Sequence, residues 1–255
     1  MREIRTWLRF AAVIWGMIYV ISLSFILYPI VSHAFWRKWI HKHWARYMVW
    51  AVGAKLEINT TLGKNYIQPN TMFAQNHISW LDTLVMSSVH CVNYVGKVEM
   101  LKWGLIRNVI KSGGTVFINR KNKRELVTAN KKIAAVLADG WGMGLFPEGT
   151  TSDGTAILPF HASIFEAAMI AKSRVVPAVL RYRHAKGGLA TEVTFAGKGW
   201  METVMNTLRL DDLVIKIDVL EPVNATDFPD RESLSQYMYA KISDFYHSDL
   251  KANQN

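Results

Sequence analysis

The N-terminal part of the chain is dominated by one long apolar run. No charged residue interrupts the sequence from Phe10 to Val31, a stretch of 22 positions. A helix rises about 1.5 Å per residue, so a helix over this run could cross a hydrocarbon core about 30 Å thick. Pro29 should kink or end that helix near its far end.

The length of the run argues against two other interpretations. A secretory signal peptide has a shorter apolar region and a small-x-small cleavage site, which this sequence does not clearly contain. A helix buried in the core of a domain is usually shorter as well. We therefore predict a membrane-embedded helix over about residues 10–31.

The segment from Trp36 to about Leu56 has an amphipathic pattern. Charged residues alternate there with apolar and aromatic ones, which are Trp36, Trp39, Ile40, Trp44, Tyr47 and Met48. This pattern predicts an interfacial helix. We expect residues 1–56 to form a two-helix membrane anchor and residues 57–255 to form the main domain. Basic residues flank both ends of the first helix, so the positive-inside rule leaves open whether it spans or re-enters.

Beyond about residue 57 the chain alternates between short β-rich runs and helical ones. The predicted strands are 71–75, 92–96, 115–119, 144–146, 175–181, 192–195 and 213–220. The predicted helices are 80–90, 100–112, 123–138, 162–172 and 232–250. This alternation predicts an α/β fold with a largely parallel sheet flanked by helices.

The charge of the chain changes the picture of its partners. A formal net charge of +10 requires an acidic partner, such as nucleic acid, an anionic membrane or an acidic protein. In the first fifty residues seven Lys and Arg side chains face only Glu3, and six of the ten tryptophans lie in the same stretch. Basic residues mixed with tryptophan beside an apolar run are typical of a lipid headgroup layer. We therefore expect a bilayer as partner and no nucleic acid.

Cysteine and histidine usage gives no sign of a metal centre. Cys91 is the one cysteine, which excludes an internal disulfide and a CxxC metal motif. The eight histidines are scattered without ligand spacing. We expect neither a metal nor a resident cofactor.

The segment Asn76 to Asp82 (NHISWLD) lies between a predicted strand and a predicted helix. Ser79 and Asp82 have the spacing of a capping box, which gives Asp82 a structural reason to be there. The turn at Ser79 would also let the His77 imidazole fold back toward Asp82. A carboxylate on one ring nitrogen fixes the tautomer, so that the other nitrogen can accept a proton. This pair predicts a general base, although the spacing alone also occurs for structural reasons.

Two further segments combine a predicted strand end with polar chemistry. Gly114 to Arg120 (GTVFINR) ends in a basic cluster, and the Arg120 guanidinium could bind a phosphate or carboxylate. Lys121, Lys123 and Arg124 fit a solvated helix start. Basic residues there oppose the helix dipole, which favours an anionic partner.

The segment Phe146 to Ser152 (FPEGTTS) is a strand that runs into a sharp turn. Pro147 and Gly149 impose the turn, and Gly149 permits close approach of a ligand to the backbone. Glu148 is presented at the strand end. Taken singly, this would be an ordinary turn.

In this order, NHISWLD, GTVFINR, FPEGTTS and the later VVPAV of residues 175–179 resemble the motifs of the glycerolipid acyltransferase family. The family is typified by 1-acylglycerol-3-phosphate acyltransferase, and its first motif reads NHxxxxD. The resemblance covers about residues 70–180, with a weaker match of the N-terminal anchor and the tail.

The resemblance implies an activity. A fatty acyl group would move from acyl-CoA or acyl carrier protein to the free hydroxyl of a lysolipid. The leading acceptor is 1-acylglycerol-3-phosphate, which gives phosphatidic acid in phospholipid biosynthesis. The resemblance also implies an inner (cytoplasmic) membrane location with the catalytic domain on the cytoplasmic side.

The resemblance implies residue roles as well. His77 would be the base, and Asp82 would orient it. Substrate binding would fall to the other motif positions, which are Asn76, Ser79, Gly114, Arg120, Glu148, Gly149, Thr150 and Pro177. The Pro177 segment would lie on the acyl side of the site.

One position departs from the family pattern. The third motif usually reads EGTR, and Thr151 stands where the arginine would be. The neutral hydroxyl removes a bidentate phosphate contact, an interaction worth roughly 1.5–3 kcal/mol. Relatives with EGTT acylate lysolipids with larger headgroups or lyso-aminolipids. Another lysophospholipid or lyso-ornithine lipid is therefore the alternative acceptor. Asn119, where aspartate is frequent, is a smaller change.

Two other classes of protein stay open. A lipid hydrolase would use Ser79 or Ser152 as nucleophile, but no GxSxG elbow surrounds either serine. A non-catalytic membrane scaffold would show no dependence on His77.

Overall fold

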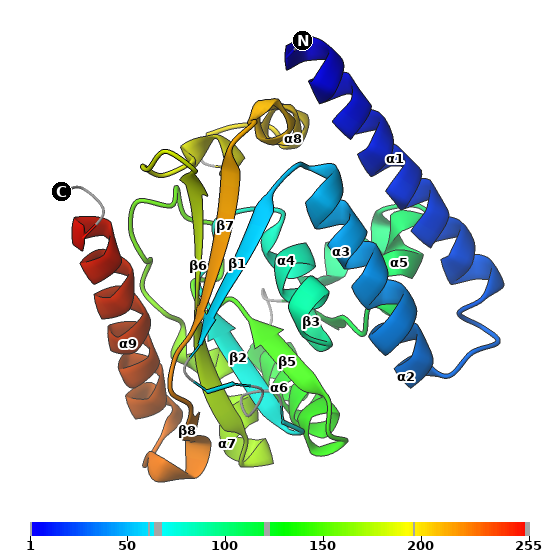
Figure 1. Ribbon diagram of the computed structural model, residues 1–255. Coiled ribbons are helices and arrows are strands. Elements are labelled where there is room, and N and C mark those ends of the chain that lie inside the picture. The colour runs from blue at the N-terminus through cyan, green and yellow to red at the C-terminus, as the bar shows by residue number, and fades with distance from the viewer. Residues whose placement is uncertain (1, 61, 64–67, 120–122, 196, 253–255) are drawn as a thin grey trace.

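The computed structural model describes residues 2–60, 62–63, 68–119, 123–195 and 197–252. Within these residues an eight-stranded sheet has the order β1-β7-β6-β2-β5-β3-β4, with β8 paired to β6 (Figure 1). The strands are β1 (Lys55–Thr60), β2 (Thr71–Gln75), β3 (Val92–Lys97), β4 (Val116–Ile118), β5 (Gly142–Leu145), β6 (Arg174–His184), β7 (Leu213–Val219) and β8 (Val223–Asn224).

The sheet is largely parallel. The pairs β1–β7, β2–β5, β2–β6, β3–β4 and β3–β5 are parallel, whereas β6 runs antiparallel to β7 and β8. The flanking helices include α4 (Asp82–Val89), α5 (Ile106–Ser112), α6 (Lys123–Ala138), α7 (Glu166–Ala171), α8 (Trp200–Arg209) and α9 (Arg231–Ala252). In Figure 1, α9 covers the side of the sheet opposite the N-terminal helices. The predicted α/β class is confirmed.

The N-terminal helix α1 (Arg2–Ile26) begins earlier than predicted and ends before Pro29. It is the one helix in the described chain that is long and apolar enough to cross a membrane. The following helical segment comprises α2 (His33–Phe35), a π-helix (Trp36–His41) and α3 (Lys42–Ala51).

The prediction of two anchor helices is wrong for the second one. Trp36, Arg37 and Trp44 of this segment are buried, and Trp44 belongs to the same apolar core cluster as Tyr246 of α9. An amphipathic pattern has the same period whether its apolar side meets lipid or a protein core. The predicted helix also ran to Leu56, whereas β1 begins at Lys55. The division of the chain at residue 56/57 stays a prediction.

Two errors occur in the C-terminal half. The predicted strand 192–195 is a 3₁₀ turn (Thr191–Val193) followed by a single bridge between Ser79 and Thr194. Helix α8 lies outside every predicted element. Its buried face includes Thr203 and Thr207, so the apolar period that reveals a helix is interrupted by hydroxyls.

The glycine-rich run before the third motif has a packing role. Gly142 and Gly144 lie opposite Val92 and Tyr94 in the β3–β5 register. A Cβ atom on Gly142 would lie 3.1 Å from the Val92 side chain, and one on Gly144 would lie 2.5 Å from the Tyr94 ring. The glycines therefore leave room for the β3 side chains to lie against β5.

Sheet register also positions the motifs. Strands β2 and β5 are parallel neighbours, with Ala74 opposite Leu145. The NHISWLD and FPEGTTS segments therefore leave the sheet side by side at its carboxyl edge. In parallel sheets this is the edge where ligands bind.

Candidate active site

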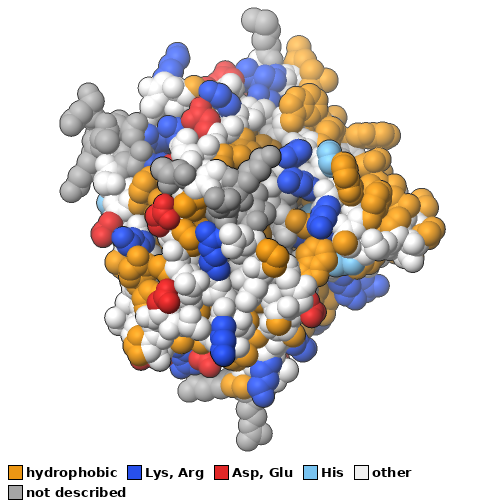
Figure 2. All heavy atoms as spheres, turned by 60° about the horizontal axis from the view of Figure 1, so that its bottom comes forward, with side chains coloured by type: hydrophobic (Ala, Val, Ile, Leu, Met, Phe, Trp, Pro, Cys, Tyr) orange, Lys and Arg blue, Asp and Glu red, His pale blue; other side chains and the backbone are white. Residues whose placement is uncertain are grey.

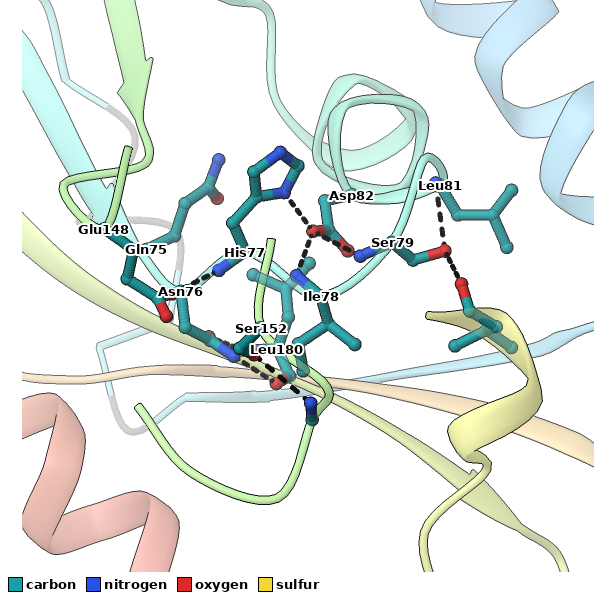
Figure 3. A network of polar contacts seen from close by, with 12 residues as sticks. Gln75, Asn76, His77, Ile78, Ser79, Leu81, Asp82, Glu148, Ser152 and Leu180 are labelled. Carbon is teal, nitrogen blue, oxygen red and sulfur yellow. Dashed lines mark hydrogen bonds and ion pairs between the residues drawn. The ribbon is translucent and has the colours of Figure 1, made fainter. Parts of the chain in front are cut away.

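His77 lies in the turn after β2, with 23% of its side chain exposed. Its Nδ1 atom is 2.7 Å from Oδ2 of Asp82 (Figure 3). A carboxylate can only accept, so Nδ1 carries the proton and donates it to this bond. Figure 3 shows Nε2 turned away from Asp82. Nε2 is thus the ring nitrogen that can accept a proton from a substrate.

The Asp82 carboxylate is buried and receives four donors. Besides His77, the backbone N–H groups of Ile78 (2.7 Å) and Ser79 (3.0 Å) donate to Oδ2. The Tyr182 hydroxyl donates to Oδ1 at 2.6 Å. These bonds compensate for the loss of water around a buried carboxylate. They also fix the position of the group that orients His77.

One half of the predicted capping box is present. The Ser79 N–H donates to Asp82, but the Ser79 hydroxyl does not accept from the Asp82 N–H. It donates instead to the carbonyl of Val193 at 2.8 Å. Asp82 therefore both closes the turn and holds the imidazole, and its structural and chemical roles coincide.

Glu148 fixes the backbone of His77 from the neighbouring strand end. Its buried carboxyl accepts from the His77 N–H at 2.6 Å through Oε1 and from the Leu158 N–H at 2.9 Å through Oε2. In the same turn, the Ser152 N–H donates a hydrogen bond to the His77 carbonyl at 2.8 Å. Burial raises the pKa of Glu148 to about 7, against the opposing effect of these backbone donors.

Aromatic rings support one face of the imidazole. The His77 ring stacks on Phe146 with centroids 3.9 Å apart and an angle of 18° between the planes. Tyr94 stacks on Phe146 in turn, at 5.6 Å and 12°. The three rings form a column that we call the aromatic column, and Gly144 leaves the space in which Tyr94 lies.

His77 lines a cavity of about 480 Å³, which we call the catalytic cavity. Its walls come from the first and third motifs, from α4, from the 98–115 region and from the N-terminal helical segment. Apolar wall residues include Trp44, Leu84, Val95, Met100, Trp103, Val109, Ile110 and Phe195. A largely apolar cavity of this size, with a few polar groups beside a base, is suited to a lipid substrate.

Comparison with known proteins agrees with this geometry. A family model described as acyltransferase matches residues 58–181. A 1-acyl-sn-glycerol-3-phosphate acyltransferase of Neisseria gonorrhoeae is 32% identical over 191 residues, which are 74% of this chain and 75% of that protein. The chain belongs to the acyltransferase family.

Another relative and a solved structure are also similar to this acyltransferase. A lyso-ornithine lipid O-acyltransferase of Rhizobium meliloti is 34% identical over 167 residues, 64% of this chain and 55% of that protein. The crystal structure of the 1-acyl-sn-glycerophosphate (LPA) acyltransferase PlsC from Thermotoga maritima matches with a TM-score of 0.73 and 18% identity. The match covers 99% of this chain and 98% of the Thermotoga maritima chain, so the two proteins have the same fold. The family predicted from the motifs is confirmed.

Two predicted substrate-binding residues of the acyltransferase have structural contacts. Asn76 is buried and pairs with the backbone of Leu180, donating to its carbonyl at 2.9 Å and accepting from its N–H at 2.7 Å. It thereby continues the pairing of β2 with β6 beyond the strand end. Ser79 is buried as well and bonded to Val193. Contact of either residue with substrate stays a prediction.

Other predicted residues lie at or near the catalytic cavity. Gly149 and Thr150 line it, and so does Thr151. Gly149 has φ 72°, a conformation that favours glycine. Gly114 has φ 74°, and a Cβ there would lie 2.1 Å from the Asn93 side chain. Its neighbours Gly113 and Thr115 line the cavity.

Arg120 and Pro177 come from the second motif and from the VVPAV segment. Arg120 lies outside the described residues. Pro177 is buried within β6, opposite Ala74 of β2. Their substrate contacts, like that of Glu148, stay predictions.

Sequence reasoning missed Tyr182 and Tyr94. Tyr182 donates to Asp82 from a position 100 residues further along the chain, so no local spacing could connect the two. Tyr94 is a buried residue of β3, and aromatic residues are common in strands. Neither tyrosine belongs to one of the motifs, so no signal in the sequence singled it out.

Helix α1 indicates membrane association by its length and composition. Figure 2 shows hydrophobic side chains gathered at the side of the molecule where the N-terminal helices lie. Exposed apolar residues of α1 include Ile4, Trp7, Leu8, Ile14, Trp15, Ile18, Tyr19, Phe25 and Ile26.

Proposed function

We propose that the protein transfers a fatty acyl group from acyl-CoA or acyl carrier protein to the free hydroxyl of a lysolipid. The leading acceptor is 1-acylglycerol-3-phosphate, and the product is phosphatidic acid. One observation carries the proposal: buried Asp82 holds Nδ1 of His77, while the imidazole lines a largely apolar cavity. The curated relatives are named for lysolipid acylation, which supports the same reaction class.

In the proposed reaction His77 acts as a general base. Nε2 takes the proton of the acceptor hydroxyl as that oxygen attacks the thioester carbonyl. The resulting imidazolium is stabilised by Asp82. Collapse of the tetrahedral intermediate breaks the carbon–sulfur bond, and the proton on Nε2 passes to the leaving thiolate. The reaction needs neither a metal nor a resident cofactor.

The oxyanion of the intermediate requires hydrogen-bond donors. The Ser79 hydroxyl already donates to Val193, which makes it a poor choice. Thr150 and Thr151 line the same cavity as His77. Their backbone amides and hydroxyls are the donors that we propose.

Thr151 also bears on the choice of acceptor. It lines the catalytic cavity where the family pattern has an arginine, so it lacks the charge that pairs with a phosphate. Four of the relatives are lyso-ornithine lipid O-acyltransferases. Lyso-ornithine lipid is therefore the second candidate acceptor.

Contacts along α1 support a position in the plane of the membrane surface. The helix is tied to the body near its start by an ion pair between Arg5 and Asp211. In its middle, Tyr47 donates to the Ala12 carbonyl and Trp44 to the Gly16 carbonyl, both at 2.9 Å. A helix that packs on the body over much of its length is suited to lie in the interface. We propose that it rests on the cytoplasmic side of the inner membrane.

The test is an acyl-transfer assay on membranes that carry the protein. Labelled acyl-CoA and acyl carrier protein are offered with lysophosphatidic acid, other lysophospholipids and lyso-ornithine lipid. We expect transfer by the wild type and by His247→Ala, a matched control on the exposed face of α9. We expect His77→Ala to lose activity by a factor of about 10²–10⁴. Equal activity of His77→Ala and wild type would rule out the proposed base.

The acceptor is tested by Thr151→Arg. If the headgroup binds near residue 151, the new guanidinium should favour a phosphomonoester over the zwitterionic ornithine headgroup. We expect the ratio of kcat/KM for lysophosphatidic acid over lyso-ornithine lipid to rise about tenfold. An unchanged ratio would place the headgroup elsewhere.

A further inference from the structure

His41 brings a second imidazole to the wall of the catalytic cavity. It is the last residue of the π-helix, and its side chain lines the cavity together with His77. Only 8% of the residue is exposed. π-Helical turns are rare and often occur at functional sites. The predicted interfacial helix gave this residue no role, because a helix on the outside of the molecule would not reach the site.

The proton of His41 is fixed by Arg37. Nη1 of Arg37 lies 3.0 Å from Nδ1 of His41, and a guanidinium can only donate. Nδ1 must therefore accept, and the ring proton is on Nε2. Burial lowers the pKa of His41 well below its usual value, and the charges of Arg37 and His33 act in the same direction. The imidazole is thus a neutral donor through Nε2.

The donor has no partner in the described part of the chain. Nε2 of His41 makes no hydrogen bond there. It faces Gly113, where a Cβ atom would lie 3.1 Å away. The Trp44 ring packs against the His41 ring with centroids 5.4 Å apart, and Val109 and Ile110 line the same cavity. A free donor in such a largely apolar wall is suited to a ligand that accepts its hydrogen bond.

We propose that Nε2–H of His41 donates to the carbonyl oxygen that joins the resident acyl chain of the lysolipid to its headgroup. This inference rests on the proposed function. A neutral N–H donor selects an uncharged acceptor oxygen, and the apolar wall is suited to the chain that follows it. Every acyl lysolipid has such a carbonyl, whether ester or amide. His41 thereby distinguishes acyl-linked from alkyl-linked acceptors.

The experiment compares 1-acyl-glycerol-3-phosphate with its 1-O-alkyl analogue of equal chain length, which lacks the carbonyl. If the wild type accepts only lyso-ornithine lipid, the pair is that lipid and its analogue with a secondary amine in place of the amide. The measured quantity is the ratio of kcat/KM for the two acceptors in one enzyme preparation. This ratio does not depend on how much of a variant is folded.

We expect the wild type to prefer the acyl-linked acceptor about tenfold, as the loss of one hydrogen bond would produce. His41→Leu should bring the ratio close to one. His41→Gln should keep most of the preference, because its amide can accept from Arg37 and donate into the cavity. His43→Leu, the matched control on the exposed side of the same segment, should leave the ratio unchanged.

Two results would overturn the inference. Equal kcat/KM ratios in wild type and His41→Leu would show that His41 does not bind the carbonyl oxygen. A wild type that transfers no acyl group to any lysolipid would overturn the proposed function, and this inference with it.

Discussion

The two turns at the carboxyl edge of the sheet each contain a buried carboxyl group, and the two groups are held in different ways. Asp82 accepts four hydrogen bonds, one of them from the imidazole of His77. Glu148 accepts from two backbone amides, and one of these belongs to His77. Asp82 controls the ring, whereas Glu148 controls the backbone that carries it. A carboxyl group thus fixes the tautomer of His77 in one turn and the backbone position of His77 in the other.

The largest expected effect comes from Asp82→Asn. The amide has one accepting oxygen where the carboxylate has two, and it carries no charge to stabilise the imidazolium that forms on His77. We expect kcat to fall by a factor of about 10²–10⁴ with a small change in KM. Steady-state kinetics check this, with Asp244→Asn on the exposed face of α9 as the control. A kcat within threefold of wild type would remove Asp82 from the mechanism.

Glu148→Gln should have a smaller effect on turnover. The amide oxygen of Gln can still accept from one of the two backbone N–H groups. The second N–H would face the amide NH₂ group, which is also a donor, at a cost of about 1–3 kcal/mol. His77 would then move with its backbone but keep its bond to Asp82. We expect kcat to fall about tenfold. If the loss equals that of Asp82→Asn, the division between ring control and backbone control is wrong.

Glu148 should also make stability depend on pH. Its pKa is raised by burial from 4.5 to about 7, so between these values the folded protein keeps a proton that the unfolded chain has lost. Stability therefore falls as pH rises through this window, by roughly 3 kcal/mol in all. We expect the wild type to lose more stability than Glu148→Gln between pH 5 and 7.5. Unfolding midpoints of both proteins in detergent measure the difference, and parallel pH profiles would contradict the prediction.

The smallest effect is expected from Tyr182→Phe. Burial raises the pKa of Tyr182 well above its usual value, so the hydroxyl remains a donor to Asp82 at neutral pH. Its removal leaves Asp82 with three donors and should lower the free energy of unfolding by about 1 kcal/mol. We expect kcat to fall about threefold. A loss as large as that of Asp82→Asn would assign the orienting role to Tyr182 instead.

The sequence predicted the parts of the molecule that depend on short-range patterns. Strand 71–75 and helix 123–138 have the predicted bounds. The pairing of His77 with Asp82 also followed from a turn within one segment. Register then brought Glu148 to His77 without any direct sign in either motif, because β2 and β5 are neighbours in the sheet but far apart in the chain.

The features that could not be predicted depend on tertiary packing, that is, on which surface the apolar face of a helix or strand contacts. Helix α3 has an amphipathic period that lipid or a protein core would satisfy equally well. The contribution of His41 to the cavity depends on its position beside Gly113 and on the bond from Arg37 to the Val92 carbonyl, which no local spacing records. The donor from Tyr182 to Asp82 similarly requires knowledge of the strand order.

The glycine at position 144 has a consequence for how this protein tolerates change. A methyl group there would displace Tyr94, and the displacement would pass through Phe146 to the imidazole of His77. A survey of random variants should therefore find Gly144 as intolerant of substitution as a residue that touches the substrate. In this acyltransferase a residue can be intolerant of substitution because it supports the catalytic imidazole from a distance. Gly144 does so from the middle of strand β5.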